Sequence, residues 1–207
     1  MKDSVSYKNY FDVVITPPAP VKEYVIQISQ KIAKQEDGEF VLGKTRFVPH
    51  ISLFHIPIKK AQLPEIKQKI KKVLSDSRLG LLRLKKITVL KETLVWIQVS
   101  RPQWLVNLHC KIVQETMPFR DPDFDAMKAW SNQYNSSQKK LIKIYGSPYV
   151  GRFFIPHITL TVLNLKNANP GEIPFKPKKF RVSSISLYQL GPHHSCEKRI
   201  FTLKKPK

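Results

Sequence analysis

A six-residue segment occurs twice in this chain, and the repeat constrains the fold more than any other feature of the sequence. Residues 48–53 read VPHISL, and residues 155–160, which lie 107 positions later, read IPHITL. That spacing is close to half of the 207 residues. A repeat of this period indicates two similar halves, each of which contributes one strand to a shared site.

The two segments place polar groups on one face of each expected strand. Side chains alternate between the faces of a β-strand, so His50 shares a face with Ser52, and His157 shares a face with Thr159. The aliphatic residues that follow each of these side chains point to the core. Two such strands, brought together, offer two imidazoles and two hydroxyls around one concave site.

This set of groups suits the hydrolysis of a phosphodiester. One histidine takes a proton from the attacking water while the other gives a proton to the leaving oxygen. The hydroxyls of Ser52 and Thr159 can donate hydrogen bonds to the non-bridging phosphate oxygens. This route needs no cofactor and no metal. The sequence has no H-E-x-x-H motif and no carboxylate close in sequence to either motif, which argues against a metallohydrolase.

The paired motifs carry a family resemblance. Two H-x-[ST] motifs, each preceded by proline, followed by an aliphatic residue and separated by half of the chain, resemble the 2H phosphoesterase superfamily. Its members include LigT-like RNA 2′,3′-cyclic phosphodiesterases, 2′,5′-oligoadenylate phosphodiesterases and snRNA-trimming exonucleases. The resemblance implies a bilobal α+β fold, in which two pseudo-symmetric antiparallel sheets flanked by helices enclose a central cleft. It also implies metal-independent chemistry with His50 and His157 as general acid and base, in an order that stays open.

Residues near the motifs are candidates for further substrate contacts. An arginine just upstream of each motif can anchor a phosphate, although an exposed arginine without a ligand is the commoner case. Residues 152–163 are expected to form one strand, which places the first of two adjacent phenylalanines on the face of His157 and Phe154 in the core. The candidates are Arg46, Tyr149, Arg152 and Phe153.

The remaining histidines are interpreted as structural. His55 lies five residues after His50 and is therefore expected on the opposite face of a regular strand. His109 falls in an expected helix, either on its surface or in the core. His193 and His194 follow Gly191-Pro192 in an expected turn, where two adjacent imidazoles could bind a metal adventitiously.

Charge and composition indicate the kind of partner. The chain has 36 Lys and Arg against 15 Asp and Glu, a net charge of +21, which favours polyanions such as RNA, DNA or phosphorylated small molecules. Eleven basic residues between positions 59 and 91 meet only Glu65 and Asp76, which indicates either a solvated helix face or a phosphate-binding surface. A basic nucleotide-binding module that keeps the cleft without turnover is therefore the alternative to an enzyme.

Two cysteines and the lack of a long apolar run indicate the compartment. Cys110 and Cys196 form no C-x-x-C motif, and no segment approaches the length needed to cross a bilayer. We therefore expect a monomer in the cytoplasm, or in the nucleus, with RNA or a nucleotide as substrate and no membrane partner.

Periodicity predicts one domain over residues 1–207 and the elements that carry these residues. A long excursion over 117–149, with a short helix near 124–134, is expected to form a lid or a substrate-facing loop. The chain between 40 and 56 is expected to form two short strands around Gly43. Strands are predicted over 10–16, 81–90, 94–99, 152–163, 180–190 and 199–203, and helices over 21–32, 64–74 and 102–116.

Overall fold

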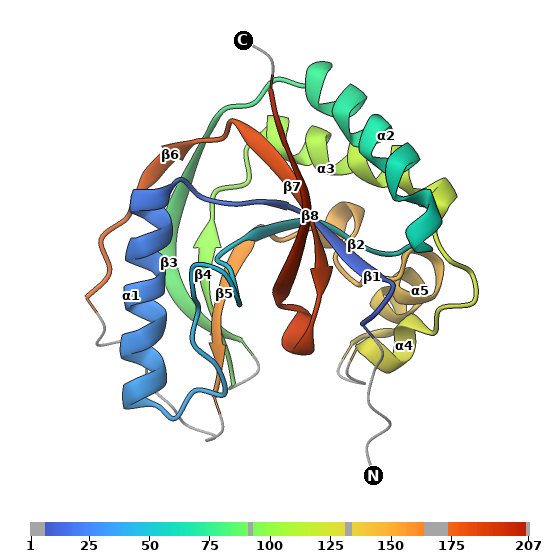
Figure 1. Cartoon of the computed structure of the whole chain (residues 1–207). Coiled ribbons are helices and arrows are strands. Elements are labelled where there is room, and N and C mark those ends of the chain that lie inside the picture. Colours follow the sequence, from blue (N-terminus) through green and yellow to red (C-terminus); the bar gives the residue numbers. More distant parts are fainter. Residues whose placement is uncertain (1–6, 91–92, 131–133, 164–173, 206–207) are drawn as a thin grey trace.

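The computed structural model describes residues 7–90, 93–130, 134–163 and 174–205. It contains two four-stranded antiparallel sheets flanked by helices (Figure 1). The first sheet has the order β2-β1-β7-β8 and consists of β1 (Tyr10–Ile15), β2 (Ile51–Pro57), β7 (Ser184–Leu190) and β8 (Cys196–Lys204). The second has the order β5-β4-β3-β6 and consists of β3 (Leu81–Leu90), β4 (Leu94–Val99), β5 (His157–Val162) and β6 (Lys179–Arg181).

Two of the helices tie the sheets together. Helix α1 (Ala19–Gln35) follows β1 of the first sheet and packs against β5 of the second. Helix α3 (Gln103–Thr116) follows β4 of the second sheet and packs against β2 of the first, beside α2 (Leu63–Ser75). Each of these helices buries one apolar stripe, as their periodicity requires. Because of this exchange, buried residues of both sheets belong to one hydrophobic core.

The two motif strands share the same backbone irregularity. In the pairing of β1 with β2 the register skips Leu53, and in the pairing of β4 with β5 it skips Leu160. Each skipped residue is a β-bulge three positions after a motif histidine. The two halves of the chain therefore repeat each other in local geometry as well as in sequence, and β2 and β5 contact one another.

Several predicted elements are confirmed. The strands expected over 10–16, 81–90 and 94–99 are β1, β3 and β4, and the helices expected over 21–32, 64–74 and 102–116 are α1, α2 and α3. Two residues of the connection predicted between β3 and β4, Lys91 and Glu92, lie outside the described residues. The expected turn at 191–194 joins β7 to β8.

The prediction of two short strands over 40–56 is wrong. This chain runs as a loop as far as His50, and the strand begins at Ile51. Side chains of other elements bind its backbone: the Leu42 amide donates to Ser29 Oγ, and Thr161 Oγ1 donates to the Phe40 carbonyl oxygen. These backbone groups are satisfied without a sheet partner.

Two predicted strand boundaries also need correction. The strand expected over 152–163 begins only at His157, because Gly151–Phe153 form a 3₁₀ turn and Pro156 has no amide hydrogen for a sheet. The strand expected over 180–190 is split between the sheets as β6 and β7, and that expected over 199–203 extends over all of β8. Of the connection expected over 164–177, residues 164–173 lie outside the described residues.

The excursion contains a helix that the sequence analysis missed. Instead of one helix near 124–134, of which 131–133 lie outside the described residues, there are α4 (Ala126–Ala129) and α5 (Ser136–Tyr145). The Asn135 side chain caps α5, and Gly146 ends it with a φ of 82°. The excursion is fixed to the first sheet, since Tyr10 Oη donates to the Gly146 carbonyl oxygen at 2.6 Å.

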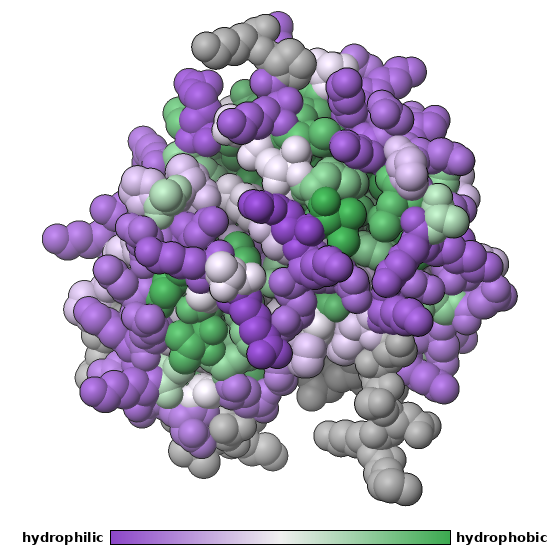
Figure 2. All heavy atoms as spheres, viewed as in Figure 1, coloured by the Kyte–Doolittle hydropathy of each residue, from purple (hydrophilic) through white to green (hydrophobic). Residues whose placement is uncertain are grey.

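The surface agrees with the composition. Hydrophilic side chains cover most of the face shown in Figure 2, with apolar side chains in smaller areas between them. Within the described ranges, no helix is both long and apolar enough to cross a bilayer.

Candidate active site

The two motif histidines are held in the same way. Nδ1 of His50 donates to the Val48 carbonyl oxygen at 2.7 Å, and Nδ1 of His157 donates to the Ile155 carbonyl oxygen at 2.7 Å. A carbonyl oxygen can only accept a hydrogen bond, so Nδ1 carries the hydrogen in both rings and Nε2 keeps the lone pair. Both imidazoles are thus oriented by the residue two positions earlier, with Nε2 as the reactive atom.

The two imidazoles are close enough to influence each other. Burial lowers the pKa of His157 to about 4, and positive charge on His50 and His55 lowers it further, against the hydrogen bond to Ile155, which raises it. Burial also lowers the pKa of His50, although the nearby carboxylate of Asp12 raises it. Both rings are therefore biased toward the neutral form, and only His50 has a carboxylate close to its Nε2.

That carboxylate is the main functional group that the sequence analysis missed. Asp12 is fully buried on β1, and its Oδ2 accepts a hydrogen bond of 2.6 Å from Ser52 Oγ. The same oxygen lies 3.2 Å from His55 Nε2 and 3.7 Å from His50 Nε2. Asp12 precedes His50 by 38 positions, so proximity in sequence gave no signal. An acid inside the otherwise apolar strand YFDVVI was the available signal, because such residues are rarely buried without partners.

The prediction for His55 is wrong in its geometry. The bulge at Leu53 adds one residue to β2, which reverses the alternation beyond it and returns His55 to the face of Ser52. His55 therefore joins the Asp12 cluster instead of pointing away from it. Its ring also packs edge-on against Trp130 and His194.

The two motif hydroxyls have different surroundings. The Ser52 hydroxyl gives its hydrogen to Asp12, so the predicted contact of Ser52 with phosphate requires that this bond be exchanged. Thr159 is half-buried and has no hydrogen-bond partner among the described residues. In the second half, the positions that match Asp12 and His55 are the apolar residues Leu94 and Val162. The two motifs are thus alike in sequence and differ in their polar neighbours.

Aromatic rings border the site on the side of His157. The ring of Tyr149 packs edge-on against His157 with a centroid distance of 6.0 Å, which places this predicted contact residue beside the site. Trp96, which lies opposite Thr159 in β4, has its ring 4.1 Å from that of His157. The sequence analysis missed Trp96, since its position opposite the motif depends on the pairing of β4 with β5.

The other predicted contact residues have partners of their own. Arg46 pairs with Glu197 at 3.0 Å and is exposed. Arg152 is exposed and stacks over the ring of Phe153 at 4.9 Å. The alternation that assigned Phe153 to the site face does not apply, because this residue lies in the 3₁₀ turn rather than in a strand. A contact of these three residues with substrate stays a prediction.

Three groups of the site lie close enough together to share a metal ion. One ligand atom from each of Asp12, His50 and Cys196 lies within 4.8 Å of the others. Cys196 is buried at the start of β8, and burial raises the pKa of its thiol well above the ordinary value. The adjacent His193 and His194 do not converge: His193 lies 3.4 Å from a Glu39 carboxylate oxygen, whereas His194 stacks on Trp130.

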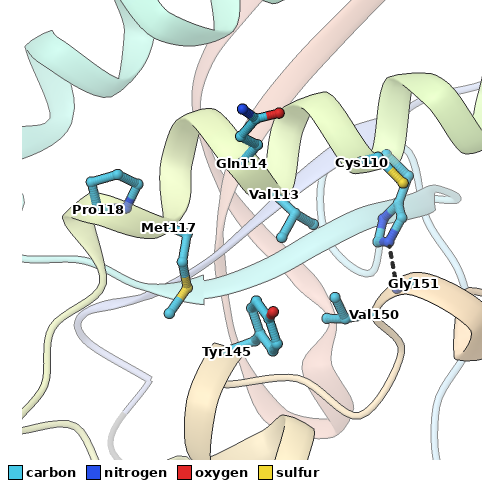
Figure 3. Close-up of a pocket in the computed structure, with 9 residues that line it drawn as sticks. Cys110, Val113, Gln114, Met117, Pro118, Tyr145, Val150 and Gly151 are labelled. Carbon is cyan, nitrogen blue, oxygen red and sulfur yellow. Dashed lines mark hydrogen bonds between the residues drawn. The ribbon is translucent and has the colours of Figure 1, made fainter.

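A separate apolar cavity of about 530 Å³ lies between α3 and the segment that follows α5 (Figure 3). Neither motif histidine lines it. His109 does, and its interpretation as a core residue is confirmed: Nδ1 donates to the Leu53 carbonyl oxygen at 2.6 Å, and Nε2 accepts from the Gly151 amide at 3.1 Å, the dashed line in Figure 3. His109 thus joins the bulge of β2 to the turn before the second motif.

Comparison with known proteins assigns the fold. No protein-family model and no curated protein matches the sequence. A structure of E. coli LigT complexed with 3′-AMP is 16% identical, with a TM-score of 0.60, and the match covers 96% of this chain and 99% of that one. TT0787 of Thermus thermophilus is 12% identical, with a TM-score of 0.62 and coverage of 94% and 97%. A third structure, of a phosphoesterase, is 15% identical, with a TM-score of 0.59 and coverage of 96% and 99%. The chain has the LigT-like α+β fold.

Proposed function

We propose that this protein is a metal-independent phosphodiesterase of the 2H type. Its substrate is an RNA-type phosphodiester, either a 2′,3′-cyclic phosphate end or a 2′,5′-linked oligonucleotide. The observation that carries the proposal is the matched pair of imidazoles, each of which donates from Nδ1 to a carbonyl oxygen two residues earlier and keeps Nε2 for proton transfer. A protein that only binds nucleotides has no need for two such groups.

The two histidines take different roles. His157 is the general base, because no carboxylate lies beside its Nε2 and its lowered pKa keeps the lone pair available. His50 is the general acid, because Asp12 Oδ2 at 3.7 Å from its Nε2 stabilises the imidazolium. Water then loses a proton to His157 as it attacks phosphorus, and the leaving ribose oxygen takes a proton from His50. The Thr159 hydroxyl donates to a non-bridging oxygen.

Nucleotide chemistry agrees with the rest of the molecule. LigT has been solved with 3′-AMP, with ATP and with NADP+. A net charge of +21 attracts phosphate groups, and the ring of Tyr149 beside His157 offers an apolar surface for a base or ribose. On this proposal the excursion over 117–149 supplies one wall of the substrate site.

Turnover of a small substrate panel tests the proposal. The panel contains 2′,3′-cyclic nucleotides, RNA with a cyclic end, 2′,5′-oligoadenylate and oligouridylate, all with EDTA present. We expect His50→Ala and His157→Ala each to lower kcat/KM by about 10²–10⁴ while circular dichroism stays unchanged. His193→Ala is the matched control, because that imidazole is exposed and pairs with Glu39 away from the motifs, and it should keep the wild-type rate.

Two results would contradict the proposal. Near wild-type activity of either motif variant would exclude the two-histidine mechanism. Tight binding of the panel without any turnover would favour the alternative, a basic nucleotide-binding module that has kept the cleft.

A further inference from the structure

A buried thiol lies at the candidate active site, and the proposed reaction does not use it. Cys196 begins β8 and packs with Val14, Val48 and Tyr188, on the same side of the first sheet as Asp12. One ligand atom of Cys196 lies within 4.8 Å of those of Asp12 and His50. Thiolate, imidazole and carboxylate are the three ligand types that zinc takes in proteins.

The distances fit a metal ion after a small contraction. Zinc bonds of about 2.0–2.3 Å to nitrogen, oxygen and sulfur place the ligand atoms of a tetrahedral site about 3.3–3.6 Å apart. His50 Nε2 and Asp12 Oδ2 are already 3.7 Å apart. The remaining ligand distances must shorten by no more than about 1 Å to reach the tetrahedral values.

The polar groups around the three ligands are arranged as they are around metal sites. Asp12 Oδ1 is buried without a hydrogen-bond partner among the described residues, so one oxygen of this carboxylate is available to an ion. Asp12 Oδ2 accepts from Ser52, and His50 Nδ1 donates to the Val48 carbonyl oxygen. A metal-bound histidine characteristically donates its second ring N–H to such an acceptor, which orients the ring toward the metal.

We propose that Asp12, His50 and Cys196 bind a divalent transition ion of the zinc class, and that the bound ion inhibits the phosphodiesterase. Inhibition follows because the ion occupies Nε2 of His50, the atom that must carry the proton for the leaving group. The inhibitory half of this inference rests on the proposed function, whereas the binding half does not. The thiol of Cys196 loses its proton to solvent when the ion binds.

Cobalt absorption tests binding without any assay of activity. Co²⁺ is titrated into the full chain, and a thiolate ligand gives a charge-transfer band in the near ultraviolet. We expect one equivalent of Co²⁺ to produce this band in the wild type and in Cys110→Ser, and Zn²⁺ to abolish it by displacement. Cys110 is a matched control, because it is the second of the two cysteines and is exposed on α3.

Removal of the buried thiol should abolish the band. Cys196→Ala is the main variant, and the isosteric Cys196→Ser replaces it if circular dichroism shows that the alanine variant is unfolded. A band that persists without Cys196, that is lost in Cys110→Ser or that is absent from the wild type would overturn the assignment of the site.

Inhibition is measured separately, with each rate expressed relative to the same variant's rate in EDTA. We expect Zn²⁺ to inhibit the wild type and Cys110→Ser, EDTA to restore both, and Cys196→Ala to need on the order of tenfold more Zn²⁺. Activation by Zn²⁺ would overturn the inhibitory half. A chain that gives the cobalt band but hydrolyses no substrate of the panel would refute the proposed function and the inhibitory half with it, and would leave the binding half supported.

Discussion

At the scale of single residues, the two motif histidines differ in the charge beside them. His50 lies near the buried carboxylate of Asp12, whereas the matching position in the second half is Leu94. A carboxylate close to an imidazole favours its protonated form, and an apolar side chain favours the neutral form. Two nearly identical hexapeptides can thus perform opposite proton transfers.

The two motif hydroxyls should respond differently to mutation. Thr159→Val should lower kcat/KM by about 10²–10³, because this hydroxyl is available to donate to phosphate. Ser52→Ala should reduce the rate less and instead lower the free energy of unfolding by about 1–3 kcal/mol, because the buried Asp12 loses its donor. Cyclic-nucleotide hydrolysis and urea unfolding measure the two effects. A larger rate loss in the serine variant would show that Ser52 leaves Asp12 to bind phosphate.

The pH profile should be bell-shaped, with its maximum on the acidic side. His157 must be neutral, so kcat/KM falls as pH drops through its pKa of about 4. His50 must be protonated, and burial lowers its pKa below the ordinary value of 6.5, so kcat/KM also falls as pH rises toward that value. The measurement is kcat/KM against pH in EDTA. A rate that rises without a maximum from pH 4 to pH 8 would be incompatible with an imidazolium acid.

At the scale of secondary-structure elements, the β-bulges decide which side chains reach the site. A regular β2 would turn His55 away from Ser52, and the extra residue at Leu53 brings it back. His109 holds this bulge from behind through the Leu53 carbonyl oxygen and holds the turn before β5 through the Gly151 amide. One buried imidazole thus links the backbone of both motif segments.

Two glycines of the excursion and the following turn form a matched pair for a stability test. Gly146 and Gly151 have φ values of 82° and 61°, so alanine at either position is strained by about 1–2 kcal/mol. A Cβ at Gly146 would also lie 2.7 Å from Pro57 Cδ, whereas a Cβ at Gly151 meets nothing within 4 Å. Gly146→Ala should therefore lower the free energy of unfolding more than Gly151→Ala, by about 1–3 kcal/mol. Urea unfolding measures the difference, and equal losses would contradict the packing of α5 against β2.

At the scale of the whole molecule, the first sheet separates the site from the lysine-rich helix. Helix α2 packs beside α3, and its Ile66 and Ile70 belong to the same core cluster as Phe11 and Val13 of β1. Asp12 lies between those two β1 residues and faces the other side. The exposed lysines of α2 therefore lie behind the sheet that carries the site, which favours a solvated face over a phosphate-binding surface.

Salt dependence measures whether these lysines contact RNA. Replacing them by glutamine should leave kcat unchanged and the slope of log kcat/KM against log salt unaltered for a cyclic-ended oligonucleotide. The slope should fall by about 0.7 for each phosphate contact that is lost. A fourfold salt range resolves that change, and a flatter slope in the variant would mean that RNA wraps around the first sheet to α2. The four replaced residues are Lys67, Lys69, Lys71 and Lys72.

The sequence by itself determined what depends on short-range patterns. Apolar periodicity located α1, α2 and α3, and β-branched and aromatic runs located β1, β3 and β4, because these signals lie within one element. The repeated hexapeptide indicated two similar halves and singled out both motif histidines. Asn135 and Gly146 were sufficient signals for α5, although they were interpreted as a polar passage.

The tertiary structure decided everything that depends on the pairing of distant strands. Asp12 reaches His50 only because β1 pairs with β2, and Cys196 reaches both only because β7 places β8 in the same sheet. A bulge leaves no mark in the sequence but reverses every side chain beyond it, so the face of His55 could not be read from its position. The physical reason is that the charge environment of a buried group comes from its neighbours in space, and those neighbours are fixed by backbone pairing between residues far apart in the chain.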